Sequence, residues 1–148
     1  ADGVPLSCVI KKTDRGDYLG QEMMSKGDFV GAISLLEPYS QKYPKNETVL
    51  ANLGLCYLNA NRFDDAARVL NQSMQLSKEN YQTAYYLGLA YFYKQDFTNA
   101  AAILTNVVKE NPYFPPPYRV LAECMMKLHD NNAASYYANI YQQLAGGR

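Results

Sequence analysis

The sequence contains no tryptophan, one histidine and three cysteines among its 148 residues. So few imidazole and thiol groups, with no cluster of them, predict no metal site, and the sequence has no glycine-rich phosphate loop. The formal net charge is zero, and there is no basic stripe of the kind that binds nucleic acid. No apolar run approaches the roughly 20 residues of a membrane-spanning helix. We therefore predict no metal, no cofactor, no nucleic-acid partner, no membrane span and no enzymatic activity.

Residues 1–12 lack both the basic start and the long apolar stretch of a signal peptide. We expect a soluble protein and favour the cytoplasm, with the periplasm as the alternative if Ala1 follows a cleaved signal peptide. Glycine and proline in this segment oppose a helix, so we expect residues 1–12 to form an extended or disordered extension. Its apolar residues, between Val4 and Ile10, offer an alternative in which the segment folds back onto the rest of the chain.

The sequence is rich in aromatic residues, with 14 tyrosines and 5 phenylalanines, and its helical period is clearest in residues 81–102. Leu87, Gly88 and Tyr91 share one stripe, because they are spaced three or four residues apart. A second apolar stripe, turned by about 100°, consists of Tyr85, Leu89 and Phe92. Polar residues at 94–96 interrupt the apolar run, and a second helical pattern begins at Phe97. The stretch therefore predicts a helix–turn–helix.

This helix–turn–helix pattern recurs at intervals of 34 residues. Small residues recur in its first helix as Gly20, Gly54, Gly88 and Ala122, and in its second helix as Ala32, Ala66, Ala100 and Ala134. A fixed period of this length is typical of a solenoid of stacked helical pairs. Small residues at these places allow paired helices to approach to roughly 8–10 Å.

The repeat resembles the tetratricopeptide repeat, whose pattern is W-x₂-L-G-x₂-Y followed by A-x₃-F and P. The third repeat has, at the corresponding places, Ala84, Leu87, Gly88, Tyr91, Ala100, Leu104 and Pro112, and no repeat has the tryptophan. The resemblance implies an all-α fold, a right-handed superhelical solenoid of four helix–turn–helix repeats. We place the tetratricopeptide repeat domain at residues 13–148, with repeats at residues 13–46, 47–80, 81–114 and 115–148.

In this family, the second stripe of each first helix lines a concave groove that binds peptides or helices. By matching position, we predict that the groove of this chain carries Asn52, Leu55, Leu58, Asn59, Tyr85, Leu89, Phe92, Tyr93, Arg119 and Glu123. The predicted groove is apolar in its middle, which suits a protein or peptide segment with aliphatic or aromatic anchors. Only Asn52 matches the clamp by which one subfamily grips the acidic C-terminus of heat-shock chaperones, so we do not expect that ligand.

The last predicted helix carries a second apolar surface, which consists of Tyr137, Ile140, Tyr141 and Leu144. Solenoids normally close with a polar capping helix, so we expect this surface to pair with a second copy of the chain in a homo-oligomer, or with protein sequence beyond the given residues. The alternative is that these side chains cover the preceding pair of helices.

Two of the cysteines, Cys56 and Cys124, occupy equivalent places in the second and fourth repeats. Two repeats of separation exceed the Cα–Cα limit of about 7 Å for a disulfide. We therefore predict that both are small buried core residues.

These features together predict an adaptor or assembly scaffold that holds a partner segment in the groove. Two alternatives stay open. One is a dedicated chaperone of bacterial secretion substrates, because residues 122–127 look similar to a stretch of type III translocator chaperones, which belong to this family. The other is a self-assembling scaffold, as in family members that coat organelles.

Overall fold

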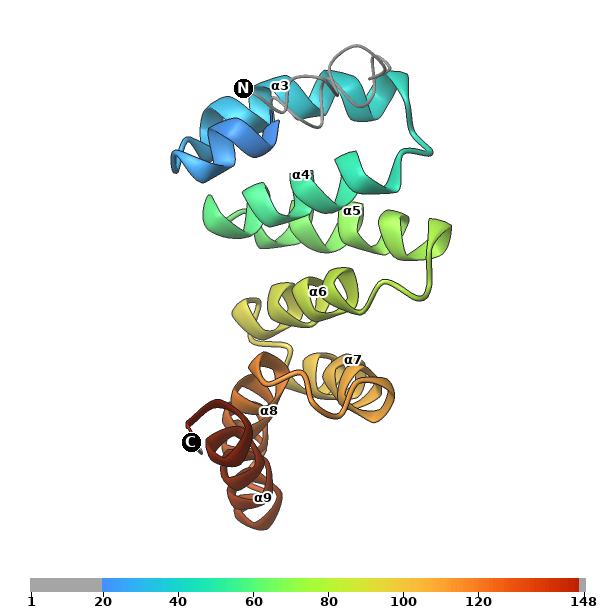
Figure 1. Cartoon of the computed structure of the whole chain (residues 1–148). Helices are drawn as coiled ribbons and strands as arrows, with labels where there is room; N and C mark the ends of the chain where they lie inside the picture. The colour runs from blue at the N-terminus through green and yellow to red at the C-terminus, as the bar shows by residue number, and fades with distance from the viewer. Residues whose placement is uncertain (1–19, 147–148) are drawn as a thin grey trace. The chain divides into compact units, whose positions relative to one another are not determined.

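A computed structural model describes residues 20–146 of the chain. Every regular element in this range is a helix, which confirms the predicted all-α fold. Residues 20–25 are helical and precede the labelled elements of Figure 1. The elements that follow are α3 (Phe29–Lys42), α4 (Glu47–Asn59), α5 (Phe63–Leu76), α6 (Tyr81–Tyr93), α7 (Phe97–Glu110), α8 (Pro116–Lys127), α9 (Asn131–Tyr141) and a π-helical turn η1 (Gln142–Gly146). The predicted extension at residues 1–12 lies outside the described residues.

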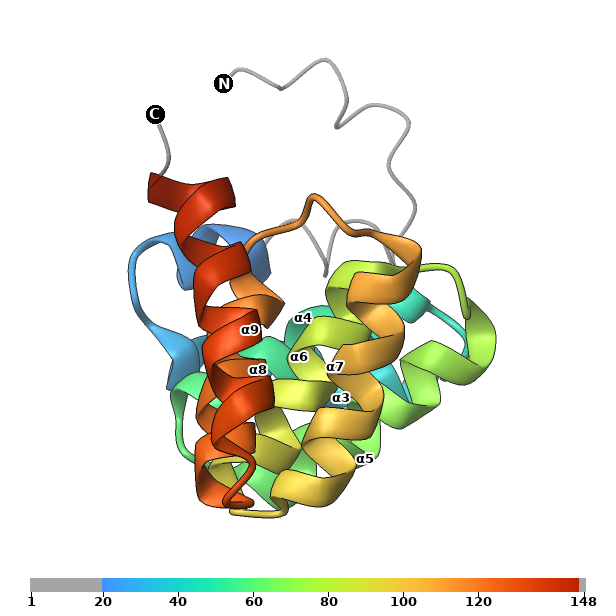
Figure 2. The same ribbon diagram turned by 90° about the horizontal axis from the view of Figure 1, so that it is seen from below.

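The chain divides into two compact units, with the boundary in the sequence between Ser77 and Lys78. The N-terminal unit contains α3, α4 and α5, and the C-terminal unit contains α6 to α9 and η1. Within each unit, every helix lies against the next one along the chain. Figure 2 shows this arrangement for α8 and α9. The predicted helix–turn–helix pairs α4–α5, α6–α7 and α8–α9 are therefore present.

The turn inside each pair ends its first helix with a residue in the left-handed conformation. These residues are Gly27, Asn61, Gln95 and His129, with φ between 61° and 79°. In each turn, the N–H that follows this residue donates to a carbonyl five residues earlier, as from Asp96 to Tyr91 at 2.9 Å. This is the Schellman geometry of a helix C-terminus, and it recurs at the 34-residue interval of the sequence.

The residue after the left-handed one usually starts the second helix of the pair as its N-cap. The carboxylates of Asp28, Asp96 and Asp130 each accept a hydrogen bond from the N–H three residues on, at 2.9, 3.2 and 3.1 Å respectively. Such caps satisfy one of the free N–H groups of a helix start. In α5 the corresponding residue is Arg62, which makes no side-chain cap.

The two helices of a pair cross where a glycine faces a leucine. A methyl group built on Gly88 would lie 2.5 Å from Cδ2 of Leu104, and one on Gly54 would lie 2.4 Å from Cγ of Leu70. Both distances are far below van der Waals contact, so only glycine leaves room for the leucine. In the fourth repeat, the corresponding residues are Ala122, which is buried, and Ala138, which is exposed, so this pair lacks the glycine–leucine contact.

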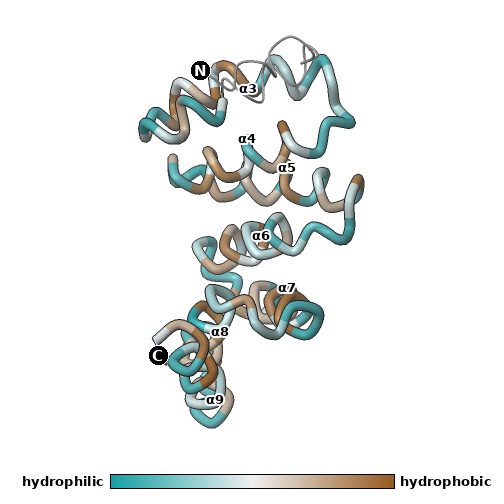
Figure 3. Tube along the Cα trace, viewed as in Figure 1, coloured by the Kyte–Doolittle hydropathy of each residue, from teal (hydrophilic) through white to brown (hydrophobic). Residues whose placement is uncertain are grey.

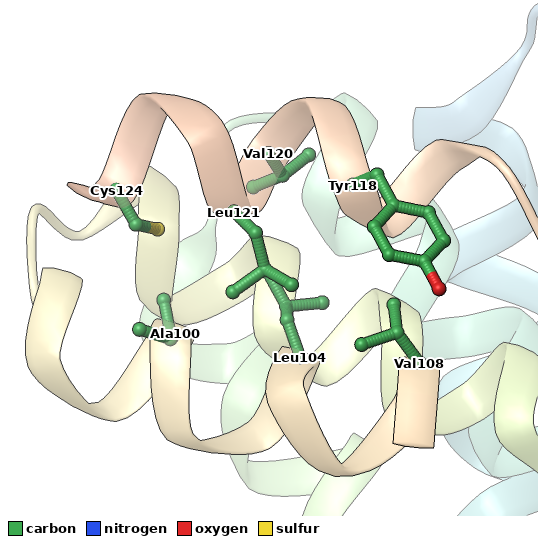
Figure 4. Packing of buried hydrophobic residues seen from close by; sticks show 8 residues of the cluster. Ala100, Leu104, Val108, Tyr118, Val120, Leu121 and Cys124 are labelled. Carbon is green, nitrogen blue, oxygen red and sulfur yellow. The ribbon is translucent and has the colours of Figure 1, made fainter. Parts of the chain in front are cut away.

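The core of the C-terminal unit lies between α7 and α8. Its buried members are Ala100, Ala101, Leu104, Val108, Tyr118, Val120, Leu121 and Cys124. Figure 4 shows Leu104 and Leu121 pointing toward each other from the two helices. α7 therefore packs on both sides, with α6 in its own pair and with α8 of the next pair.

Each helix buries one side, and hydrophilic and hydrophobic segments accordingly alternate along the trace in Figure 3. In α5, Ala66 and Leu70 are fully buried, whereas Asp64 and Arg68 are exposed. None of the helices within residues 20–146 combines the length and the apolar character needed to cross a membrane.

Three prolines form the start of α8. Pro115 is the N-cap with φ −69° and ψ −41°, and Pro116 is the first helical residue. Proline is tolerated in a first turn because the N–H groups there have no partner within the helix. Pro117 and Tyr118 are buried, and the Tyr118 hydroxyl donates to the carbonyl oxygen of Pro112 at 2.8 Å.

The crossing of α6 and α7 gives a first prediction. Gly88→Ala should lower the free energy of unfolding by about 1–3 kcal/mol because of overpacking, although alanine favours a helix over glycine by about 1 kcal/mol. In a Leu104→Ala background, the same change should cost nothing, because its clash is gone. Urea unfolding of the four proteins measures this coupling. An equal cost in both backgrounds would show that Gly88 and Leu104 do not set the crossing.

The left-handed turn residues give a second prediction. Gln95→Gly should raise the free energy of unfolding by about 0.5–1 kcal/mol, because glycine adopts a positive φ without the cost that a side chain brings. Asn61→Gly should gain less, since asparagine tolerates this conformation. Thermal unfolding monitored by circular dichroism compares the two variants. Equal effects of the two substitutions would contradict the strain assigned to Gln95.

Candidate functional site

The predicted groove residues of α6 lie against the core of their own unit. Tyr85, Leu89 and Phe92 are half-buried and pack on the α7–α8 cluster, and the Phe92 ring lies 5.6 Å from that of Phe97. We predicted these three side chains to line a groove, and the structure shows that part of each one is buried in the fold. These side chains support the fold and also show part of their surface, so truncating them should reduce stability as well as any binding.

The exposed part of this surface lies on α6 and α8, which contact each other. Tyr93 is 51% exposed at the end of α6, and Arg119 and Glu123 are exposed on α8. Burial raises the pKa of the Tyr85 hydroxyl, and the charge of Arg119 opposes that rise. Tyr85 therefore lies within electrostatic reach of Arg119. We call Tyr85, Leu89, Phe92, Tyr93, Arg119 and Glu123 the α6–α8 face.

An aromatic cluster joins two residues that were not predicted, Tyr81 and Phe114, to this face at Tyr85. The Phe114 ring meets those of Tyr81 and Tyr85 edge-on, at centroid distances of 5.0 and 5.6 Å. Tyr81 precedes Tyr85 by one helical turn, so the stripe begins earlier than predicted. The four-residue spacing of Tyr81 and Tyr85 could have predicted that they share one face of a helix. No pattern in the sequence could have placed Phe114 beside them, because it lies in the α7–α8 loop.

The predicted groove residues of α4 differ among themselves. Asn52 and Leu55 are half-buried. Leu58 is only 7% exposed, so it is a core residue, and its assignment to an accessible groove is corrected. Asn59 is exposed, and its side-chain nitrogen donates to the backbone oxygen of Leu55 at 2.9 Å. The accessible part of this set is therefore smaller than predicted.

The side chains proposed for self-association pack mainly on their own unit. Tyr137, Ile140, Tyr141 and Leu144 are half-buried and lie against the α7–α8 core. Tyr136, the neighbour of Tyr137, is 62% exposed. Coverage of the preceding helices, the alternative stated above, accounts for these four residues without a second copy of the chain.

A polar network that is partly open to solvent links α3, α4 and the start of α5, with the Glu37 and Arg62 side chains 39% and 47% exposed. The Tyr57 hydroxyl donates a short hydrogen bond to Oε2 of Glu37, and Nη2 of Arg62 lies 3.7 Å from the same oxygen. The Arg62 guanidinium lies 4.6 Å from the centroid of the Tyr57 ring and forms an ion pair with Asp65 at 3.0 Å. Arg62 thus joins two helices in the position where the other pairs have an aspartate cap.

This network changes the acidity of Tyr57, which is 1% exposed. Burial and the Glu37 carboxylate raise the pKa of the Tyr57 hydroxyl from 10.0 to about 12, against the opposing charge of Arg62. Both causes favour the neutral hydroxyl. Tyr57 therefore acts as a hydrogen-bond donor within the N-terminal unit at all physiological pH values.

The described residues show no arrangement suited to metal binding or thiol chemistry. Residues 20–146 contain no group of three or more histidine, cysteine, aspartate or glutamate side chains that could hold a metal ion. Cys56 and Cys124 are both buried, as the sequence predicts. Burial raises the pKa of their thiols to about 12 and about 11 respectively. Both thiols therefore stay protonated and unreactive.

Comparison with known families gives two matches along the chain. Models of the tetratricopeptide repeat match residues 23–90 and residues 82–112. A curated relative, the BBSome complex member BBS4 homolog of Drosophila melanogaster, is 28% identical over 111 residues. That alignment covers 75% of this chain but 23% of the relative, so the chain spans about a quarter of the relative's length.

Solved structures of similar fold include those of MamA. One crystal structure of MamA superposes with a TM-score of 0.80 and 23% identity, covering 86% of this chain and 75% of the other. A second has a TM-score of 0.83 and 23% identity, covering 91% and 74% of the two chains. At such identities the likeness concerns the fold alone.

The polar network gives a third prediction. Tyr57→Phe should lower the free energy of unfolding by about 1 kcal/mol, because the hydrogen bond from Tyr57 to the partly exposed Glu37 carboxylate is lost. Since the pKa of Tyr57 is higher in the folded chain, its contribution to stability is fully present below pH 10.0 and is lost as the pH rises toward 12. Urea unfolding at neutral pH and across this alkaline range measures both effects.

A matched control for this experiment is Tyr113→Phe, because Tyr113 is 83% exposed. It should change neither the stability nor its dependence on pH. If Tyr57→Phe unfolds with the same alkaline dependence as the unmodified protein, the Tyr57 hydroxyl is not responsible for that dependence.

Proposed function

Because the chain belongs to the tetratricopeptide repeat family, we propose that it is a non-catalytic protein-interaction scaffold that binds a partner segment on its α6–α8 face. The family's repeats supply the fold, and the residues on the surface decide the partner. The known relative whose name places it in a multi-protein complex supports an assembly role of this kind. Because the chain spans a small part of that relative, we do not propose that it belongs to the same complex.

The observation that carries the proposal is the composition of the α6–α8 face. Half-buried aromatic and aliphatic side chains from α6 lie next to exposed charges of both signs on α8, with Tyr93 51% exposed at the edge. Aromatic anchors beside a charged rim are typical of interfaces in which a few residues supply most of the binding energy. Core packing of Tyr85, Leu89 and Phe92 holds their exposed edges in fixed places, which reduces the entropy lost on binding.

The partner that fits this face is a protein segment with apolar anchors and at least one charged side chain. The apolar anchors match the edges of Leu89 and Phe92, and the charge matches Arg119 or Glu123 on the next helix. A segment of this kind is also what a dedicated chaperone of secretion substrates would hold. The nature of the captured segment therefore separates the two functions.

The fourth prediction tests the face with substitutions that spare the core. Tyr93→Ala and Arg119→Ala should each weaken binding of the partner by about 1–2 kcal/mol, or roughly tenfold, with an unchanged melting temperature. The partner is first identified by photo-crosslinking from position 93 and mass spectrometry. Isothermal titration calorimetry with the purified partner then measures the affinities of the variants.

The matched control is position 136, because Tyr136 is an exposed tyrosine on α9, outside the α6–α8 face. A crosslinker there should not capture the same protein, and Tyr136→Ala should bind with full affinity. Capture at both positions alike, or full affinity of both Tyr93→Ala and Arg119→Ala, would assign the partner to another surface.

A further inference from the structure

A pocket of about 350 Å³ lies in the N-terminal unit, whereas the α6–α8 face belongs to the C-terminal unit. α3 and α5 supply its polar lining, and α4 contributes Leu50, Leu53 and Tyr57. These three residues of α4 are at most 3% exposed, so the accessible lining comes from the polar side chains. The volume falls within the range of about 300–1,000 Å³ that is usual for small-molecule sites.

The pocket and the predicted groove use different sides of α4. Leu53 lines the pocket, whereas Leu55 belongs to the predicted groove. Two residues along an α-helix are about 200° apart, so the two side chains leave the helix in nearly opposite directions. Binding of a ligand in this pocket therefore does not compete with binding of a partner on the groove side of α4.

The pocket presents one charge of each sign. Glu37 of α3 uses Oε2 for its contacts with Tyr57 and Arg62, and among the described residues no hydrogen bond to Oε1 is formed. Arg68 of α5 is 57% exposed and has one ion pair, to Asp65 at 3.4 Å. The Glu37 oxygen and most N–H groups of Arg68 are thus available, and amide side chains of Gln41 and Gln72 lie in the same lining.

The repeat itself provides an internal comparison for these residues. Two repeats further along, 68 residues on, Ser40, Val69 and Gln72 are replaced by Val108, Tyr137 and Ile140. All three replacements pack in the hydrophobic core of the C-terminal unit. At Arg68 the corresponding residue is Tyr136. At Ser40, Arg68 and Gln72 the repeat therefore accepts an apolar or aromatic side chain, so these three polar residues of the pocket are not a requirement of the repeat.

We propose that this pocket binds a free α-amino acid as a zwitterion, with the ammonium group at Glu37 and the carboxylate at Arg68. A phosphate ligand is disfavoured because Glu37 would repel it. An apolar ligand is disfavoured because the apolar floor is almost fully covered. The amides of Gln41 and Gln72 both donate and accept hydrogen bonds, which suits the polar atoms of an amino acid.

The experiment titrates the full chain with each of the standard L-amino acids and follows its backbone amide signals by NMR. At least one amino acid should bind with a Kd below about 1 mM and shift signals of α3 and α5. The same amino acid as an N-acetyl amide, which lacks both charges, should not bind. Glu37→Gln and Arg68→Gln should each weaken binding at least about tenfold, the size expected for a lost charged contact.

Two further variants keep the result interpretable. Arg68→Tyr copies the residue at the corresponding place of the C-terminal unit, so it should fold with a similar melting temperature and abolish binding. Lys127→Gln removes an exposed positive charge of the other unit, outside the α6–α8 face, and should bind the amino acid normally. The proposal is overturned if no free amino acid shifts the signals at about 10 mM, well above the expected Kd, if the capped derivative binds equally well, or if binding survives Arg68→Tyr.

Discussion

The contact between a glycine on one helix and a leucine on its partner is the constraint on which the helical pairs depend. At Gly54 and Gly88 the leucine of the second helix occupies the space of a missing side chain. The helices of a pair therefore approach closely, and the larger side chains beside the crossing must find their partners in the neighbouring pair. This is why the core of the C-terminal unit lies between α7 and α8, and why much of the apolar stripe of α6 is already committed to packing.

Local spacing was enough to predict the helical pairs. The second helices of three pairs begin at Phe29, Phe63 and Phe97, the residues that recur at 34-residue intervals. Turns and caps depend on residues within five positions of each other, so a repeating sequence shows them directly. The same holds for the burial of Cys56 and Cys124, which lie three residues after the buried Leu53 and Leu121 and share their helical stripes.

The candidate site was less predictable, because it depends on which neighbour covers a given side chain. An apolar stripe on α4 or α6 indicates burial but not the partner, so Leu58 was assigned to a surface although it is core. The network joins Glu37 to Tyr57 and Arg62, which are 20 and 25 positions further along the chain. One signal for it existed in the sequence: Arg62 stands where three other turns have an aspartate.

The start of α8 hides a segment that other proteins could otherwise bind. A proline run flanked by aromatic residues, such as Phe114 to Tyr118, is the type of sequence that polyproline-binding domains recognise in an extended conformation. Here the same prolines form a helical first turn, and Pro117 and Tyr118 are buried in it. The segment is therefore displayed only by a chain that has not folded or has opened at α8. A proline-binding domain would therefore bind this sequence in the unfolded chain and would not bind it in the native protein.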